Sequence, residues 1–481
     1  MLHMTQVLRP RLAAALDETD LAGGASAVLA AVLRVPAGVA AQAFQALDID
    51  VDTFVRRTAE EVDGHVEPIG RDGWRARATA AAHRADHEFV GTEHLVDAAL
   101  DLAPDRWSRI LRKFGTSPKM LRAQLWRSAL DTSPGGTWQS VREHPVDLVL
   151  EDPVDGHASP PVAAAVGRLF AREPIVGLSL ATVTGGAIAE VVSFGCASLD
   201  PRRALTPSVP SHACSVTKIV TAAAVLRLAE KGLLSLDEPA GAYLHSLPLH
   251  APDGTPSSAT VRQLLTHTAG LAPGQGLRQY DGPVVPFAQR YRDGLRAESD
   301  PGRWSYSNLG YAVLAQVIAD VSGRDHHEQV LAPLGMTASS HGDRLPAGAA
   351  MGHVVDRGRL HTVRDSAVLV PGAGGLASTA ADLARLCIGL LPGRPDGFLT
   401  DDTIGLMNQG AVEIPRHPAR QGLGVRSREI GGELAVGHSG AWPGYRAELW
   451  WLPGRRTGVA ALCNSYTPGL FHFVTEILGG L

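Results

Sequence analysis

Lysine is nearly absent from this 481-residue chain. Of the 44 basic side chains only four are lysines, namely Lys113, Lys119, Lys218 and Lys231, so almost every positive charge is an arginine. The basic residues are offset by 49 acidic ones, which leaves no net positive field for non-specific nucleic-acid binding. The composition therefore argues against a nucleic-acid partner.

Cysteines and long apolar runs are also scarce. The four cysteines lie far apart and form no C-x-x-C pair, so we expect reduced thiols and neither a zinc ribbon nor a disulfide framework. The first residues lack the basic region, apolar region and small-residue cleavage site that follow one another in a secretory signal. The most apolar stretch, residues 25–44, is interrupted by Arg34, Pro36 and Gln42 and is too short in apolar residues to span a membrane. We therefore expect a cytoplasmic protein with no membrane partner.

Three common catalytic motifs are missing as well. No lysine sits in a phosphate-binding loop G-x-x-x-x-G-K-[ST], which excludes a P-loop ATPase. His326 and His327 precede Glu328, but a zinc helix H-E-x-x-H would need a histidine at Leu331. The G-x-S-x-G elbow of α/β-hydrolases is also absent. We expect no metal and no cofactor, and any serine chemistry must use another scaffold.

The composition along the chain predicts a multidomain protein. Residues 1–130 have the pattern of short amphipathic helices, and sliding this segment along itself aligns Gly24 with Gly91 and several aromatic and leucine positions, which indicates an all-α doubled repeat. Residues 131–160 concentrate Pro, Gly, Ser and Asp and are predicted to be a linker. Residues 161–481 are predicted to form a second, α+β domain.

The second copy of the repeat contains a recognisable stretch, Gly91-Thr92-Glu93-His94-Leu95. With the residues that follow, it resembles the Clp N-terminal domain, a doubled helical repeat that receives substrates or adaptors on protein unfoldases. The resemblance implies a possible protein partner for this module. The first copy lacks the Glu and His, and a role in dimerisation or packing remains equally open.

Strand-like runs stand at both ends of the second domain. Residues 176–184 and 188–194 flank Gly185-Gly186, and residues 448–452 and 457–462 flank Pro453-Gly454, so each pair predicts a hairpin. A C-terminal helix is expected from about Pro468. Strands at both ends with helices between them predict an antiparallel sheet closed by the two ends of one domain.

The central chemical motif is Ser215-Val216-Thr217-Lys218, which opens a long amphipathic segment. Positions i and i+3 share one face of a helix, so the Ser hydroxyl and the Lys amine can meet. A lysine takes the serine proton only when neutral, and burial together with the helix N-terminus lowers its pKa. Chance gives about 0.2 occurrences of S-x-x-K in a chain of this composition, so this motif alone is weak.

Two further motifs follow in order. Tyr306-Ser307-Asn308 has a chance expectation of about 0.04; its tyrosine can relay a proton and its Asn amide can hold the lysine and a substrate carbonyl. His438-Ser439-Gly440 precedes the last strand pair, where a residue without Cβ admits a substrate backbone. The amides of Ala441 and Ser215 are candidates for an oxyanion hole.

In this order the three motifs resemble the serine beta-lactamase and penicillin-binding-protein superfamily, in its class C-like branch of D-alanyl-D-alanine peptidases, D-aminopeptidases and esterases. Supporting stretches include Leu264-Leu265-Thr266-His267-Thr268 and Gly374-Gly375-Leu376-Ala377-Ser378-Thr379. The resemblance covers residues 165–475 and implies a beta-lactamase-like fold, an antiparallel sheet flanked by helices with a helical subdomain beside it.

The resemblance also implies the roles of the site residues. Ser215 would be the acylated nucleophile, and Lys218 and Tyr306 the general bases. Asn308 and the segment from His438 through Ser439 and Gly440 to Ala441 would bind substrate. His267 is interpreted as a structural residue. A structural role is also an open alternative for His438, because members of this superfamily often have a lysine at that position.

The sequence does not single out one substrate. We expect a serine hydrolase acting on a small ester, an amide, a beta-lactam or a D-amino-acid peptide. The alternative from another class is a sensor or scaffold protein of the same fold without turnover, whose Clp-like module recruits a protein partner. Lys218 supports the enzyme hypothesis. The chain uses arginine for almost every positive charge, but an arginine does not deprotonate in a protein and could not act as a base at this position.

Overall fold

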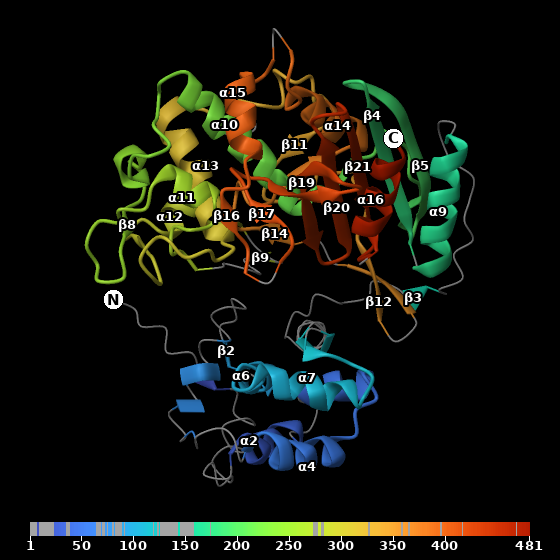
Figure 1. Cartoon of the computed structure of the whole chain (residues 1–481), viewed down its shortest axis with the longest axis vertical. Helices are drawn as coiled ribbons and strands as arrows, with labels where there is room; N and C mark the ends of the chain where they lie inside the picture. Colours follow the sequence, from blue (N-terminus) through green and yellow to red (C-terminus); the bar gives the residue numbers. More distant parts are fainter. Residues whose placement is uncertain are drawn as a thin grey trace. The chain divides into compact units, whose positions relative to one another are not determined.

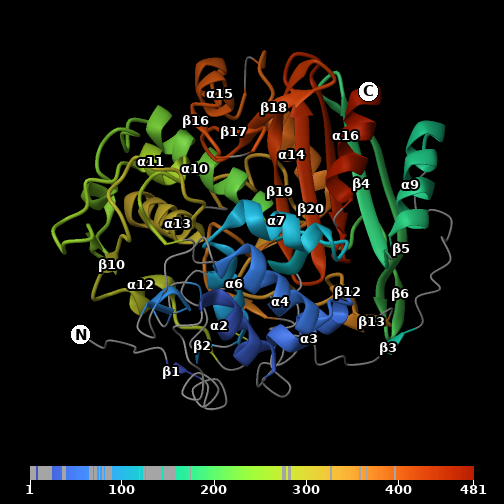
Figure 2. The same cartoon turned by 60° about the horizontal axis from the view of Figure 1, so that its bottom comes forward.

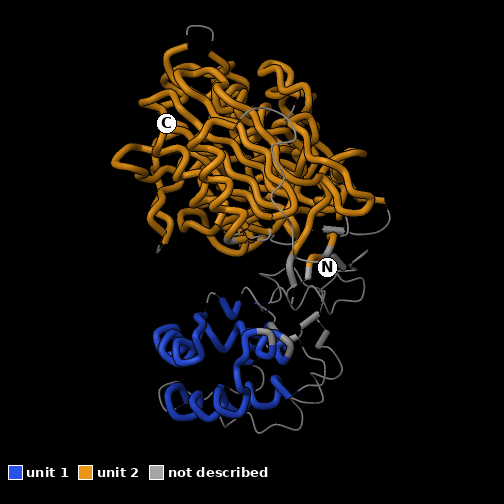
Figure 3. The backbone as a smooth tube through the Cα atoms, turned by 90° about the vertical axis from the view of Figure 1, so that its right-hand side faces the viewer, with its two compact units in different colours: residues 1–139 blue, residues 140–481 orange. Residues whose placement is uncertain are grey.

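The structure is a computed structural model. It describes residues 7–8, 24–34, 39–63, 69, 73–74, 76–78, 81, 89–90, 92–118, 120–122, 125, 143–144, 158–173, 175–272, 278–279, 283–325, 328–356, 359–363, 366–394, 397–415, 417–467 and 469–481. The chain divides into two compact units, residues 1–139 and 140–481, drawn in blue and orange in Figure 3. His326 and His327 lie outside the described residues.

The described part of the first unit is mainly helical. Its helices are α2 (Gly24–Leu33), α3 (Val39–Ala46), α4 (Val51–Glu61), α6 (Thr92–Leu100) and α7 (Pro104–Arg112). Phe44 and Trp107 pack against Phe54 at its centre, with ring centroids 4.8 and 5.8 Å away. The all-α prediction misses one short parallel pair, β1 (Val7–Leu8) with β2 (Phe89–Val90). Strands this short carry no periodicity, so the sequence pattern could not signal them.

The helix starts of this unit follow the register of the sequence repeat. Helix α2 begins at Gly24 and α6 at Thr92, directly after Gly91, which is the residue that the repeat aligns with Gly24. Helices α3 and α7 begin at Val39 and Pro104, which are 65 residues apart, close to the 67 residues that separate Gly24 from Gly91. The duplication and the Clp-like identity of the unit stay predictions.

The second unit is built on one antiparallel sheet of nine strands, in the order β16-β17-β18-β19-β20-β21-β4-β5-β6. Their bounds are β16 (Val412–Glu413), β17 (Arg420–Gln421), β18 (Arg426–Ile430), β19 (Glu433–Trp442), β20 (Tyr445–Leu452), β21 (Thr457–Cys463), β4 (Gly177–Thr184), β5 (Ala187–Leu199) and β6 (Arg202–Ala204). Both predicted hairpins are present, and β21 pairs with β4, which confirms a sheet closed by segments from both ends of the domain.

Helices cover the two faces of this sheet. On one face α9 (Pro160–Arg172) packs against α16 (Leu470–Gly480), which lies over β20 and β21 (Figure 1). Their apolar side chains form a core with inward residues of the sheet such as Trp450 and Val459. On the other face α14 (Ala380–Gly389) packs against β4, β5, β20 and β21. The result is a sheet between two helical layers.

A helical subdomain stands beside the sheet, as the resemblance implied. It contains α10 (Thr217–Glu230), α11 (Val261–Leu265), α12 (Phe287–Arg290), α13 (Asn308–Ser322), α15 (Asp401–Asn408) and the short 3-10 helices η3 (Cys214–Val216) and η4 (Ala240–Tyr243). Figures 1 and 2 both place α10, α11 and α13 to the left of the sheet. Nearly every residue of α10 is buried, so this helix is the centre of the larger core.

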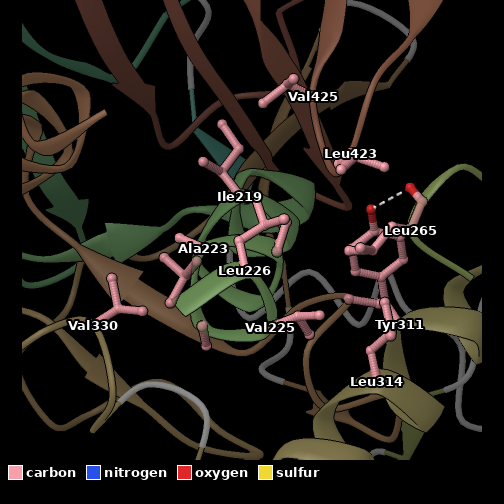
Figure 4. Close-up of a cluster of buried hydrophobic side chains, with 14 of the residues drawn as sticks. Ile219, Ala223, Val225, Leu226, Leu265, Tyr311, Leu314, Val330, Leu423 and Val425 are labelled. Atoms are coloured by element: carbon pink, nitrogen blue, oxygen red, sulfur yellow. Dashed lines mark hydrogen bonds between the residues drawn. The ribbon is translucent and has the colours of Figure 1, made fainter. Parts of the chain in front are cut away.

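Tyr311 of α13 joins the helices of the subdomain. Its fully buried ring contributes to the apolar cluster around α10, and its hydroxyl donates a 2.8 Å hydrogen bond to the carbonyl oxygen of Leu265, at the end of α11 (Figure 4). A buried phenol without such a partner would lose its hydration uncompensated. The contact therefore fixes α13 against α11. His267 follows α11 in the chain and Tyr306 precedes α13, so the contact also holds these two segments near each other.

The remaining strands form small sheets around this body. They are β7 (Ser211–His212), β15 (Leu376–Ser378) and β11 (Ser340–His341); β8 (Leu249–His250) and β10 (Leu295–Arg296); β9 (Arg278–Gln279) and β14 (Ala367–Val368); and β3 (Glu143–His144), β13 (Arg359–Thr362) and β12 (His353–Asp356). Strand β3 lies within the predicted linker and pairs with β13. Its partner is far away in the sequence, so local composition did not reveal the strand.

The four cysteines agree with the expectation from their spacing. All four cysteines are free and buried, as the spacing predicted. Across the described ranges, no helix has both the length and the apolarity to cross a bilayer.

Candidate active site

Ser215 lies in a tight turn where β7 leads into α10. The preceding residue, Cys214, has a φ of 50°, in the left-handed region that few non-glycine residues adopt. Its amide donates a 2.8 Å hydrogen bond to Nδ1 of His212. The turn is therefore held by a side chain, and it presents a half-buried Ser215 at the N-terminus of α10.

Lys218 meets Ser215 as the i, i+3 spacing predicted. Its Nζ atom lies 3.1 Å from the Ser215 Oγ and donates a 3.0 Å hydrogen bond to the carbonyl oxygen of Ala373. The side chain is 0% exposed. Burial, opposed by Tyr306 but reinforced by the positive Arg426, lowers the pKa of the lysine, which favours the neutral amine that a general base requires.

Tyr306 completes a triangle with these two residues. Its hydroxyl interacts with the Lys218 and Ser215 side chains, and Nζ of Lys218 lies 4.9 Å from the centre of its ring. Burial by itself would raise the pKa of the phenol, but the charges of Lys218 and Arg426 outweigh it and lower the pKa. The three predicted catalytic residues are thus in mutual contact.

Asn308 opens α13 directly after this tyrosine loop. Ser307 caps the helix by accepting a 3.0 Å hydrogen bond at Oγ from the amide of Gly310. The cap fixes Asn308 at the first helical position, next but one to Tyr306. The side chain is half-buried, so the structure keeps it partly open to solvent beside the tyrosine.

Strand β19 brings the third motif to the same place. Its pairing with β18 ends at Gly437, whereas its pairing with β20 continues to Trp442, so among the described strands residues 438–442 are paired on one side only; β19 also packs against η3. The pair Trp442–Tyr445 closes a tight hairpin loop, and in the antiparallel alternation the amide of Ala441 then points away from β20. An exposed Ala441 beside Ser215 is consistent with a two-amide oxyanion hole.

Gly440 is required by the turn that carries Ser215. A Cβ atom at this position would lie 2.7 Å from Cβ of Cys214, 2.9 Å from the carbonyl oxygen of Ala213 and 3.0 Å from the amide nitrogen of Ser215. From the sequence alone, the approach of a substrate backbone explained this glycine. The structure adds a different reason, because the protein's own turn already occupies that space.

His438 and Ser439 point to opposite faces of β19. The His438 ring is 1% exposed; its Nδ1 donates a 2.7 Å hydrogen bond to the carbonyl oxygen of Ser439, and its Nε2 has no partner within the described ranges. Burial, with Arg426 and Lys218 nearby, lowers the pKa of this imidazole well below its usual value. His438 therefore offers a neutral acceptor on the side of Tyr306, whose ring centre is 6.2 Å away.

The Ser439 side chain is occupied elsewhere. Its hydroxyl donates a 2.5 Å hydrogen bond to the carboxylate of Glu448 on β20, which also accepts bonds from Trp450 and Arg446. Glu448 is fully buried, and burial, opposed by Arg446, raises its pKa to about 7. Of the predicted substrate-binding residues, Ser439 can thus serve the site only through its backbone.

Two groups beside the triangle were not found from the sequence. Arg426, the first residue of β18, lies 5.6 Å from the centre of the Tyr306 ring, and its Nε has no partner in the part of the chain described. The Ala373 carbonyl, which accepts the hydrogen bond of the lysine, immediately precedes the Gly-Gly-Leu-Ala-Ser-Thr stretch. The motif from Gly374 to Thr379 could have pointed to the neighbouring Ala373 carbonyl, whereas nothing in the sequence distinguishes Arg426 from the other arginines.

The buried His212 gives this region a pH-dependent stability. Burial lowers its pKa from 6.5 to about 4, so between these values the unfolded chain takes up a proton that the folded chain does not. Stability supplied by the neutral imidazole is complete above pH 6.5 and is lost as the pH falls toward 4. We expect the free energy of unfolding of His212→Asn, measured in urea, to change less steeply with pH than that of the wild type, by about 1.4 kcal/mol per pH unit in this window. Equal slopes for both proteins would contradict the assignment.

Comparisons with known proteins agree with this geometry. The family model described as Beta-lactamase matches residues 162–477. The chain is 28% identical over 223 residues to the putative penicillin-binding protein PbpX of Bacillus subtilis (strain 168), a match that covers 44% of this chain and 54% of that protein. It is 26% identical over 307 residues to a D-aminopeptidase of Brucella canis, covering 60% and 56%. The chain thus spans little more than half of these relatives.

A solved structure shares the fold of the second unit. The octameric penicillin-binding protein homologue from Pyrococcus abyssi superposes with a TM-score of 0.56 at 27% identity, over 66% of this chain and 76% of that one. The matched family model covers well over half of the chain, including the three motifs and the whole nine-stranded sheet. The chain therefore belongs to the beta-lactamase family.

Proposed function

We propose that this protein is a serine hydrolase that forms an acyl-enzyme on Ser215. The observation that carries the proposal is the 3.1 Å contact between Ser215 and a fully buried Lys218, beside a free strand edge. A buried lysine with a lowered pKa is poised to take the serine proton. Relatives that are named as penicillin-binding proteins and as a D-aminopeptidase support the same class of reaction.

Acylation would proceed through two proton transfers. The neutral Lys218 amine accepts the proton of Ser215 as the serine oxygen attacks the carbonyl carbon, and the amides of Ser215 and Ala441 stabilise the negative oxygen of the intermediate. The proton then passes through Tyr306 to the leaving group, which departs. A water molecule hydrolyses the ester on Ser215 by the reverse sequence of transfers and restores the serine.

The substrate class follows from the groups around Tyr306. The leaving group must be reached by the tyrosine hydroxyl, so it lies on the side of His438 and Arg426. A neutral acceptor and a positive charge on that side favour a polar or anionic leaving group. We propose a small ester or amide, or a D-amino-acid peptide, as substrate; a beta-lactam is a further candidate.

Acylation and turnover must be tested together. We expect a fluorophosphonate probe to label the wild-type protein on the tryptic peptide that contains Ser215, and we expect no label on Ser215→Ala. Labelling of that variant would refute the site. Hydrolysis of p-nitrophenyl esters and of D-aminoacyl p-nitroanilides, with the L-isomers as controls, then separates enzyme from sensor. A stable adduct without turnover on any of these substrates would favour the sensor.

We further infer that the first unit is a Clp-like repeat with a protein partner. The nearly constant offset between its helix starts supports a duplication, and the Gly91 to Leu95 stretch carries the resemblance. Crosslinking of the full chain to candidate adaptor proteins tests the inference, and an absence of crosslinks through residues 1–139 would count against it.

A further inference from the structure

His267 brackets the tyrosine of the proposed site with two hydrogen bonds. Its backbone carbonyl accepts the amide of Ser305 at 2.8 Å, and its Nδ1 accepts the amide of Ser307 at 3.1 Å. These two donors are the residues on either side of Tyr306. A single residue therefore fixes both ends of the short segment that presents the phenol.

The ring of His267 also packs on the phenol ring directly. The ring centres of His267 and Tyr306 are 4.4 Å apart, and the ring centre of Tyr311, on α13, lies 5.1 Å from the imidazole. The imidazole is 2% exposed. The orientation of Tyr306 is thus limited by contact with its ring as well as by its backbone.

The hydrogen-bond pattern requires a neutral imidazole. Nδ1 accepts a backbone amide, so in the neutral ring Nε2 carries the hydrogen, and Nε2 has no partner within the described ranges. Protonation would turn Nδ1 into a donor aimed at another donor. The groups that face the ring are Lys218 of α10, Arg426 of β18, Tyr311 of α13, His438 of β19 and Tyr306 itself. Burial and the positive charges among them keep the pKa of His267 well below its usual value.

The backbone of His267 adds an independent observation. Its φ is 60°, in the left-handed region where glycine is free of strain and most other residues are not. Such strained positions cluster at functional sites, where the surrounding contacts hold them. A residue needed only for the turn could be glycine, so the side chain has a use that glycine lacks.

We propose that His267 is a positioning residue that, as a neutral imidazole, holds the Tyr306 hydroxyl on Ser215 and Lys218. The inference rests on the proposed function and adds a residue to it. His267 acts on the reaction through the tyrosine that it fixes. Its loss should slow acylation without weakening substrate binding.

Two substitutions separate the ring from the backbone. His267→Gly keeps the left-handed turn and removes the acceptor, whereas His267→Asn keeps the turn and returns an acceptor oxygen near the Nδ1 position. We expect His267→Gly to lower the rate constant of fluorophosphonate acylation, and kcat for p-nitrophenyl acetate, by about 10- to 100-fold. KM should stay within about twofold, because binding is not the step affected. His267→Asn should recover most of the loss.

The pH profile distinguishes positioning from a merely structural role. In His267→Gly the apparent pKa for acylation should fall, because a displaced Tyr306 no longer raises the pKa of the Lys218 base. His353→Asn is the matched control, since His353 is a fully buried histidine of the same unit. We expect it to lower stability while kcat and the profile stay unchanged.

Three outcomes would overturn the proposal. His267→Gly with wild-type rates and an unchanged profile would refute it, and so would a His267→Asn protein no faster than the glycine variant. If the glycine variant does not fold, a folded His267→Ala protein with wild-type rates and an unchanged profile would refute it as well. A wild-type protein that fails to label at all would instead refute the proposed function.

Discussion

Replacing Lys218 by arginine is expected to lower kcat/KM by about 10²- to 10⁴-fold, the range typical for loss of a general base. The guanidinium keeps a positive charge but does not deprotonate in a protein, so it cannot take the serine proton. It also forces a permanent charge into a position that is 0% exposed. The effect should appear in p-nitrophenyl ester hydrolysis and in the rate of fluorophosphonate labelling.

Lys231→Arg is the matched control for this variant. Lys231 is exposed at the end of the same helix, so the same exchange there should leave kcat/KM within about twofold. Lys218→Met removes the charge while keeping an unbranched chain of similar length, and it should be as slow as the arginine variant. If the arginine variant labels as fast as the control, then Lys218 is not the base.

The second large effect is expected from a single methyl group. Gly440→Ala would place its Cβ 2.7 Å from Cβ of Cys214 and 3.0 Å from the amide nitrogen of Ser215, distances that Cβ atoms in proteins rarely or never show. The nucleophile turn and β19 must then separate, which moves one amide of the proposed oxyanion hole. Loss of one such donor typically costs about 10² to 10³ in kcat, or about 2.7 to 4 kcal/mol.

Gly454→Ala provides the control for this substitution. Gly454 lies between β20 and β21, has no positive φ, and has nothing within 4 Å of the position that a Cβ would take, so alanine fits there without displacement. Steady-state kinetics of both variants with p-nitrophenyl acetate make the comparison. A Gly440→Ala protein within about twofold of its control would show that the turn tolerates the displacement and that the proposed hole is misplaced.

The parts of the site that depend on local spacing could be predicted from the sequence. Ser215 and Lys218 are one helical turn apart, so their contact follows from helix geometry alone. The terminal hairpins were predicted because their apolar strands flank Gly185-Gly186 and Pro453-Gly454. These signals are contained in short windows of the chain.

The residues that were missed depend on distant segments. Strand β18, whose residues are Arg426-Ser427-Arg428-Glu429-Ile430, has no apolar alternation, so nothing in its window predicted a strand that carries a charge to Tyr306. The role proposed for His267 could not be predicted from the sequence, because the partners of this histidine lie much further along the chain. Ser439 was grouped with its neighbours, although alternation along β19 turns it to the opposite face.

The pairing of β21 with β4 has a consequence for synthesis. The ribosome delivers β4, β5 and the segment bearing Ser215 long before it delivers β19, β20 and β21. Until then β4 has an unpaired edge, and the strand edge that faces Ser215 does not exist. Contacts so distant in sequence form slowly. The nascent chain therefore passes most of its synthesis without the Ala441 amide of the proposed oxyanion hole, which arrives only when the last strands join the sheet.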